Sequence, residues 1–533
     1  MNWRSIPWSC LAAIFLLSHV ALAQDAPRAK NIVILVSDGG GFNAFRAASL
    51  YQYGREGLQP YEQEGWLQLA SNTYPQDQLG SGASGYGGSG RAAAPPPASY
   101  WDVRMERGDA LSGEVRFRGY SALTRLPTDS AASGTAMAAG IKTLNGRVNY
   151  AGSGIGAGPL TSKTIAEIAK SLGKSAGVVT SVHWSDATPA AFGAARSSGR
   201  GERREIATQM LNNDTLDLIM GAGHPEFDSN GAPREAGEGD YEAVGGPFLW
   251  ELLRSGRHRG GWTFIQSKAQ FEALMSGPAP RRVFGAAPVA GSLQRERQTR
   301  DWNRDGRVDA ADARVAPPFG DPFNTTVPSL VTMTRAALNV LNQNPNGFFL
   351  MVEGGAIDHA AHANQPGRII EEQIDFNHSV QAVVDWVNRH SSWDQTLVIV
   401  TADHETGMLF GINSDTVAFQ PLINRGPGRA AGMWFNSGGH SSSLVPLKAR
   451  GAGAQGFNRF VDGQDPVYGP YVDNTSIFHV MEAAFAGRLP SRPAEVGGYV
   501  TAPRGSRGGR SMTDEQGVYE LQDGLENATQ MGE

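Results

Sequence analysis

Apolar runs alternate with amphipathic stretches along most of the chain. The segments 30–41 (KNIVILVSDGGG), 346–355 (NGFFLMVEGG) and 394–407 (DQTLVIVTADHETG) contain runs of β-branched or large apolar residues and predict buried strands. Residues 162–174 and 368–390 carry apolar side chains at helical spacing. Strands that alternate with helices predict an α/β fold, with a large and mainly parallel central sheet flanked by helices.

Acids and histidines gather where these apolar runs end. Asp38 follows the first run directly, and the segment 351–364 (MVEGGAIDHAAHAN) places two acids and two histidines after the second. Asp403 and His404 follow the third. Because open α/β sheets bind ligands at the carboxyl ends of their strands, we expect these side chains to share one edge of the sheet.

The N-terminus is typical of a signal peptide over residues 1–23. Arg4 supplies the positive charge, 11–17 is apolar, and Ala-Leu-Ala at 21–23 fits a cleavage site. A membrane anchor is the alternative, but the run is shorter than the ~20 residues of a span. The only cysteine, Cys10, lies in this segment, so the mature protein has neither a disulfide nor a cysteine metal site. We expect an exported protein, periplasmic or extracellular.

The 533 residues predict one large domain with insertions or two to three domains. We interpret 24–500 as the catalytic domain, 200–325 as an inserted cap with few evident strands, and 501–533 as a polar C-terminal tail. The net charge of −6 argues against nucleic acid or an anionic membrane as a partner. After removal of the signal, no segment is long and apolar enough to span a membrane.

Six of the acids and histidines have the chemistry of zinc ligands. They are Asp38, Asp358, His362, Asp403, His404 and His440. Asp358 and His362 are four residues apart, so one turn of helix would place both on one side. Nitrogen and oxygen donors without cysteine suit zinc, and six ligands suffice for two sites with an open position each. For any one of these histidines alone, a structural role is the ordinary alternative.

Three oxygen donors suit a different metal. Asp38, Glu353 and Thr188, which lies in SDATPAAF after a predicted strand, offer only oxygen. With water they would meet the octahedral oxygen coordination that magnesium requires.

Ser130, in LPTDSAASGTAMAAG, is the candidate nucleophile. The alanine-rich run after it predicts a helix, whose free N–H groups would favour an anion at its start. The alternative is that Thr128, Asp129 or Ser130 only caps this helix. The sequence has neither an evident Ser-His-Asp triad nor GxSxG around Ser130, so a zinc ion would have to lower the pKa of the hydroxyl.

Six motifs in one order resemble those of the alkaline phosphatases. They are LVSDGGG, PTDSAASGTA, SDATPAA, VEGGAIDHAAH, VTADHETG and a GGH loop, and the resemblance runs from about 29 to about 490. It implies an alkaline phosphatase-like fold and a phosphomonoesterase with two Zn²⁺ and one Mg²⁺ per chain. It also implies small phosphate monoesters as substrates, and it leaves a homodimer open.

The resemblance assigns a role to each matching residue. Ser130 would be the residue that is phosphorylated. The first zinc would be held by Asp358, His362 and His440, and would activate the hydrolytic water. The second zinc would be held by Asp38, Asp403 and His404, and would activate Ser130. Magnesium would be held by Asp38, Thr188 and Glu353, and by Asp186 through water.

An arginine of the family clamps two phosphate oxygens. Arg200 in FGAARSSGRGERR is our choice and Arg196 is the rival, because the spacing departs from the family's by about one residue. His359 stands where some members carry lysine.

Residues 301–312 (DWNRDGRVDAAD) follow the spacing of a calcium loop. Gly306 is at position 6, and the ligands would be Asp301, Asn303, Asp305, the carbonyl of Arg307, Asp309 and Asp312. The loop resembles that of dockerin modules, but a single copy does not imply a dockerin function. We interpret it as a structural Ca²⁺ site in the cap, with a solvated acidic turn as the alternative.

The sequence therefore predicts an exported alkaline phosphatase that acts through a phosphoserine. A phosphodiesterase or sulfatase of the same superfamily is one alternative. A sulfatase needs a C/S-x-P-x-R pattern that DSAAS lacks, and a diesterase would lack the magnesium ligands. The other alternative is an inactive metal-binding surface protein. The complete set of ligands argues against it.

Overall fold

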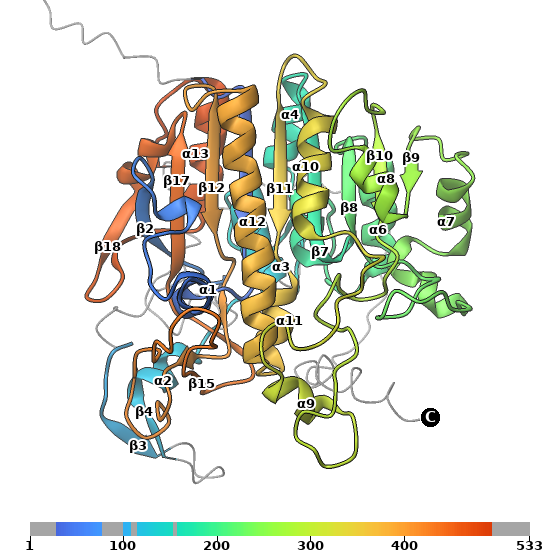
Figure 1. Ribbon diagram of the computed structural model, residues 1–533. Helices are drawn as coiled ribbons and strands as arrows, with labels where there is room; N and C mark the ends of the chain where they lie inside the picture. The colour runs from blue at the N-terminus through green and yellow to red at the C-terminus, as the bar shows by residue number, and fades with distance from the viewer. Residues whose placement is uncertain (1–27, 77–99, 108–114, 153–156, 493–533) are drawn as a thin grey trace, which may run out of the picture. The chain divides into compact units, whose positions relative to one another are not determined.

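The computed structural model describes residues 28–76, 100–107, 115–152 and 157–492. The predicted signal peptide and the polar tail lie outside these residues. At the centre of the described part is an eleven-stranded sheet (Figure 1). Its strands run in the order β18 (Val461–Asp465), β19 (Gly469–Asp473), β2 (Leu67–Asn72), β17 (Val445–Gly451), β12 (Thr396–Thr401), β1 (Asn31–Val36), β11 (Phe348–Glu353), β7 (Ser175–His183), β8 (Leu218–Ala222), β10 (Val283–Ala286) and β9 (Thr263–Ile265).

Most neighbouring strands are parallel, as the sequence predicts. Every pairing from β12 through β1, β11, β7, β8 and β10 to β9 is parallel. β17 is antiparallel to both of its neighbours. Parallel strands in such a sheet are buried on both faces, which accounts for their unbroken apolar sequences.

The central strand β1 shows this burial residue by residue. Ile32 and Ile34 enter one hydrophobic core, and Val33 and Leu35 enter the other. In the register of the sheet, Val36 lies opposite the last residues of both neighbours, β11 and β12. The polar residues that follow these three strands therefore emerge at one edge.

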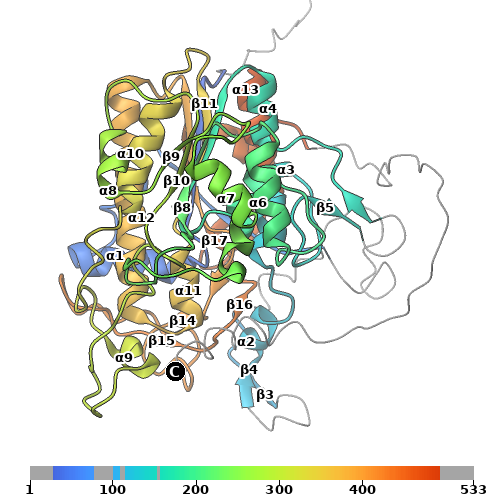
Figure 2. The ribbon, with the colours of Figure 1, turned by 90° about the vertical axis from the view of Figure 1, so that its right-hand side faces the viewer.

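Helices cover both faces of the sheet, as Figure 2 shows from its side. One face carries α1 (Phe42–Tyr53), α8 (Lys268–Ala273), α10 (Leu330–Leu341) and α12 (Pro366–His390). The other carries α3 (Ser130–Ala139), α4 (Ile165–Ser171), α5 (Ala187–Phe192), α6 (Arg203–Asn212), α7 (Pro247–Arg254) and α13 (Thr475–Ala486). None of the helices in the described part combines the length and apolar character needed to cross a membrane.

Residues 200–325 differ from the predicted cap in one respect. They contribute three strands, β8, β10 and β9, to one side of the central sheet. Strands of three to five residues are too short for their periodicity to stand out in a sequence, and their partners lie far away along the chain. The extent of a cap within this stretch stays a prediction.

Short elements connect the main ones. They are η1 (Pro60–Glu62), β3 (Met105–Arg107), β4 (Val115–Phe117), α2 (Arg118–Leu123), β5 (Tyr150–Ala151), β6 (Gly158–Pro159), η3 (Glu238–Val244), α9 (Ala310–Val315), α11 (Ala356–His362), β13 (Glu405–Thr406), β14 (Leu409–Phe410), β15 (Trp434–Phe435), β16 (His440–Ser441) and η4 (Ala454–Phe460).

Two buried ion pairs fasten the segment that carries the predicted calcium loop to α12. Arg368 of α12 donates to Asp321 at 2.7 Å, and Arg297 lies 2.8 Å from Glu371 of the same helix. All four side chains are buried. Losing one partner of such a pair leaves an uncompensated buried charge, so this contact fixes the segment in place.

Candidate active site

The turn after β1 brings two acids together. Gly39 has a φ of +68°, and a Cβ there would lie 2.7 Å from the Cα of Asp358. Glycine is therefore required both for the left-handed conformation and for the close approach of α11. The N–H of Gly39 also donates to Oδ1 of Asp403 at 3.1 Å. The turn that begins at Asp38 therefore contacts both of these acids, Asp358 and Asp403.

One group of three ligands forms between α11 and β16. Asp358 and His362 lie on one helix, as their spacing predicts, with Nε2 of His362 3.3 Å from Oδ2 of Asp358. Nε2 of His440 lies 3.0 Å from Nε2 of His362 and 3.6 Å from Oδ1 of Asp358.

The outer nitrogen of each histidine in this group faces a backbone carbonyl. Nδ1 of His362 is 2.7 Å from the oxygen of Gly438, and Nδ1 of His440 is 2.8 Å from that of Thr128. Since a carbonyl only accepts, each Nδ1 carries the proton. Each Nε2 can therefore offer its lone pair to a metal ion held beside the Asp358 carboxylate.

A second group, Asp38, Asp403 and His404, is buried beside the first. Nε2 of His404 lies 3.1 Å from Oδ2 of Asp403 and 3.5 Å from Oδ1 of Asp38. Those two carboxylate oxygens are buried and accept no hydrogen bond from the described residues. In each group the ligand atoms lie within 4.8 Å of one another. These distances and open acceptors fit a cation held by oxygen and nitrogen.

The charges of the site also fit a cation. Burial raises the pKa of Asp38 well above its usual range, and the nearby carboxylates of Asp403, Asp358 and Glu353 raise it further. Burial raises the pKa of Glu353 to about 8. Several carboxylates buried together are costly unless positive charge compensates them, and divalent ions among these residues would supply it.

Apart from Asp38, the oxygen donors predicted for magnesium lie on β11 and around α5. Thr188 is in α5, and its buried hydroxyl has no hydrogen-bond partner among the described residues. Glu353 ends β11 and accepts from the hydroxyl of Thr180. Asp186 is the N-cap of α5. An orphaned hydroxyl and a carboxylate with spare acceptors suit an oxygen-coordinated ion, but a complete magnesium site stays a prediction.

Ser130 is the first residue of α3, as predicted, and it does not cap that helix. Asp129 is the N-cap, and its Oδ1 accepts from the N–H of Ala132 at 2.9 Å. The hydroxyl of Ser130 is 3.2 Å from Nε2 of His404, within the second group. One turn later, Ser133 donates to the carbonyl of Asp403 at 2.7 Å, which fixes α3 against the ligand-bearing strand.

The two candidate arginines have different surroundings. Arg196 is turned to Glu167, 2.9 Å from Nη2, and to the carbonyl of Leu160, 2.9 Å from Nε. Arg200 reaches toward α3, and its Nη1 lies 3.3 Å from Oδ2 of Asp129. Its Nη2 lies 3.4 Å from Oδ1 of Asp186. Arg200 is therefore the one beside the serine.

Thr406 is a residue of the site that sequence reasoning missed. Its hydroxyl lies 2.5 Å from Oδ1 of Asp358 and 3.2 Å from Nδ1 of His404, so it connects the two ligand groups. The available signal was its position two residues after His404, which in a strand returns the side chain to the same face.

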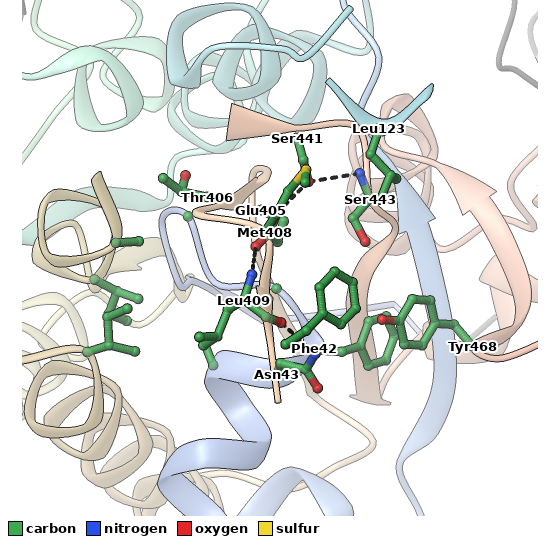
Figure 3. A pocket seen from close by; sticks show the side chains of 17 residues that line it. Phe42, Asn43, Leu123, Glu405, Thr406, Met408, Leu409, Ser441, Ser443 and Tyr468 are labelled. Atoms are coloured by element: carbon green, nitrogen blue, oxygen red, sulfur yellow. Dashed lines mark hydrogen bonds between the residues drawn. The ribbon is translucent and has the colours of Figure 1, made fainter. Parts of the chain in front are cut away.

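A small cavity of about 10 Å³ lies next to Thr406 (Figure 3). Its lining includes Glu405, Phe42 and Tyr468. Glu405 accepts from the hydroxyl of Ser441 and from the N–H of Leu409. A space of this size holds one water at most, so it is not a substrate pocket.

The predicted calcium loop has a regular internal hydrogen-bond pattern. Oδ2 of Asp301 accepts from Gly306 N–H at 3.1 Å, and Gly306 has a φ of +86°. The carboxylate of Asp312 is engaged by the N–H groups of Trp302 and Asn303. In the described part of the chain, sets of three acids or histidines at metal-binding distance occur only in the two groups around Ser130. The calcium site therefore stays a prediction.

An open α/β sheet that presents a serine beside two groups of acids and histidines is the arrangement of a metal-dependent hydrolase. Comparison with known proteins identifies the family within this class. Residues 116–426 match the family model for alkaline phosphatase. The alkaline phosphatase of Escherichia coli (strain K12) is 26% identical over 487 residues, which cover 86% of this chain and 87% of the relative.

Solved structures agree on the fold. The alkaline phosphatase from the Antarctic bacterium TAB5 has a TM-score of 0.53 and 22% identity, covering 86% of this chain and 99% of that one. The Thermus thermophilus alkaline phosphatase has a TM-score of 0.54 and 21% identity, covering 88% and 94%. The chain belongs to the alkaline phosphatase family, whose members depend on metal ions, and it hydrolyses phosphate monoesters. The sulfatase, phosphodiesterase and inactive surface protein are thereby set aside.

Proposed function

We propose that this alkaline phosphatase is exported and works through a phosphoserine at Ser130, with two zinc ions and one magnesium ion. The observation that carries the proposal is the place of the Ser130 hydroxyl, 3.2 Å from His404 and at the head of a helix. A helix N-terminus favours the negative charge of a bound phosphate.

The proposed metal ligands follow from the two groups and the oxygen donors beside them. One zinc would be held by Asp358, His362 and His440, the other by Asp38, Asp403 and His404, and magnesium by Asp38, Thr188, Glu353 and, through water, Asp186. When bound, these ions supply Lewis-acid stabilisation of the developing negative charges and lower the pKa of the hydroxyl groups near them.

The side chains of the protein perform the remaining steps. The Ser130 hydroxyl releases its proton to solvent and its oxygen forms a bond to phosphorus, while the bond to the ester oxygen breaks and the alcohol leaves with a proton from solvent. Water then attacks the phosphoserine, which releases inorganic phosphate and restores the hydroxyl. Arg200 would donate to two phosphate oxygens through its planar fork and so orient the phosphorus for attack.

The phosphoserine is tested by trapping. The enzyme turning over a radiolabelled phosphate monoester is quenched in acid and digested. Label on the peptide that contains Ser130 supports the proposal. Label on another residue, or steady turnover with no trapped label, would refute it.

The exported state and the substrate range complete the proposal. Residues 1–23 have the pattern of a signal peptide, and 24–500 would form the catalytic domain with a cap within 200–325. Small phosphate monoesters are the expected substrates, and a homodimer is compatible with this assignment.

Replacing each of the two arginines separately by alanine shows which of them binds the phosphate. Arg200→Ala should lower kcat/KM about 10- to 100-fold and weaken inhibition by inorganic phosphate, because a charge-assisted bidentate contact is lost. Arg196→Ala should mainly lower the melting temperature, since it breaks the contact with Glu167. Steady-state kinetics and thermal unfolding on both variants check this. A large kinetic loss in Arg196→Ala alone would reverse the assignment.

Calcium in the loop 301–312 is tested by thermal unfolding. Because the unfolded chain has no preformed site, bound calcium adds to stability by mass action. Replacing both Asp301 and Asp305 by alanine should lower the melting temperature measured in calcium by several degrees. The control is the unchanged enzyme in a calcium-selective chelator, with zinc and magnesium held constant. Equal melting temperatures with calcium and with chelator would favour the solvated acidic turn.

A further inference from the structure

A series of contacts leads outward from the nucleophile helix. Asp129, next to Ser130, lies 3.3 Å from Nη1 of Arg200. Nη2 of the same guanidinium is 3.4 Å from Oδ1 of Asp186, and Nη2 of Arg203 is 3.6 Å from that same oxygen. Two guanidinium groups therefore share one carboxylate oxygen. Arg203 is thus joined to Arg200 through Asp186 and lies further from the serine.

Most donors of Arg203 are available to a ligand. Its side chain is 42% exposed, and its ion pair with Asp186 is long. No hydrogen bond joins its guanidinium to another side chain or carbonyl in the part of the chain that the structure describes. A guanidinium has five N–H donors in a planar fork that matches carboxylate and phosphate oxygens. Arg203 thus carries a permanent positive charge with free binding capacity at the rim of the site.

The neighbouring arginine shows that this placement is specific to Arg203. Both residues are in the first turn of α6, but Nη1 of Arg204 donates to Oε1 of Glu242 at 3.0 Å. Successive residues of an α-helix point about 100° apart, so one arginine is directed to the site and the next to η3. Arg204 therefore provides a matched control on the same helix.

The negative charge of Asp186 is the reason for a second arginine beside the phosphate clamp. Its carboxylate stands close to the guanidinium that would clamp the phosphate, and alone it would repel an anionic substrate. Arg203 and Arg200 both hold the pKa of this buried carboxyl well below its usual range, against the effect of burial. The carboxylate is thus compensated, and the outer guanidinium presents its remaining positive field to whatever is attached to the phosphate.

We propose that Arg203 binds a second anionic group of the substrate, carried by the leaving alcohol. The preferred substrates are then phosphate monoesters that bear a carboxylate or a second phosphate a few bonds from the ester oxygen. The inference rests on the proposed function, because it takes the reacting phosphate to lie between Ser130 and Arg200, with the leaving group directed outward.

The test compares two substrates with nearly identical leaving alcohols. In 3-phosphoglycerate a carboxylate occupies the position that a hydroxymethyl group occupies in glycerol 3-phosphate. The unchanged enzyme should favour 3-phosphoglycerate in kcat/KM. Arg203→Gln should lower the ratio of the two values about fivefold, which is the upper range for an exposed charge pair. The preference should also shrink between ~20 mM and ~500 mM salt, since the group is partly exposed.

Two further variants and one trapping measurement complete the test. Arg204→Gln should keep the ratio of the unchanged enzyme, and Arg203→Lys should restore most of it. The inference is overturned if Arg203→Gln leaves the ratio unchanged, whether both kcat/KM values stay the same or both fall by the same factor. An equal loss would mean that Arg203 acts only through Asp186 and Arg200. If Ser130 is labelled with both substrates while the ratio stays unchanged, this inference alone fails. Absence of label on Ser130 refutes the proposed function and this inference with it.

Discussion

Replacing Ser130 with alanine should abolish the acid-trappable phosphoenzyme and lower kcat on the order of 10³-fold or more. The variant loses the nucleophile, and water must then attack the substrate phosphate directly. The fold should persist, because alanine is a good first residue for a helix and the cap of α3 is Asp129. The measurements are phosphoprotein trapping, steady-state kinetics and zinc content.

A second serine on the same helix provides the control for this variant. Ser133→Ala also removes a buried hydroxyl, but that hydroxyl donates to the carbonyl of Asp403. The control should lower stability by about 1 kcal/mol and still form phosphoserine. Phosphoprotein at the level of the unchanged enzyme in Ser130→Ala would contradict the role of Ser130.

Removing one carboxylate from either ligand group should lower bound zinc from about two ions to about one per chain. Asp358→Asn acts on one group and Asp403→Asn on the other, with little change in side-chain volume. Each should lower kcat/KM at least ~100-fold, because even changes in the partners of metal ligands cost 10- to 100-fold. Elemental analysis together with kinetics on each variant checks this.

The control here is a buried acid away from the site. Asp217 accepts from Lys170 and from the N–H of Ala176. Asp217→Asn should lower the melting temperature and keep both zinc ions. If Asp358→Asn and Asp403→Asn also keep two zinc ions, the carboxylates of the two groups are not the zinc ligands.

The sequence predicted the parts of the site that follow from local periodicity. The spacing of Asp358 and His362 predicts a shared helix face, and both residues lie on α11. Asp38, Glu353 and Asp403 each lie at or just after the end of an apolar run. The register of the parallel strands brings those ends to one edge. The mainly parallel sheet was predictable for the same reason, since doubly buried strands are apolar throughout.

Other features depend on contacts between distant segments. The choice between Arg200 and Arg196 depends on the path of the chain before α6, where Ala194 has a φ of +62°. Such a conformation is uncommon for alanine and is not visible in the sequence. Thr406 meets Asp358 only because β13 passes next to α11. The strands β9 and β10 carry three and four residues, and only the assembled sheet reveals them.

The hydroxyl of Thr406 has a consequence for how the two ligand groups would bind metal ions. A hydroxyl has a single proton, and Thr406 donates it to Asp358, so it accepts the Nδ1 proton of His404. This fixes the histidine tautomer with the Nε2 lone pair toward the second group. An ion that shifts the carboxylate of Asp358 on binding would also shift the Thr406 hydroxyl, which orients His404. The two proposed sites should therefore be thermodynamically linked, so that the dissociation constant measured for an ion at one site depends on whether the other site is filled.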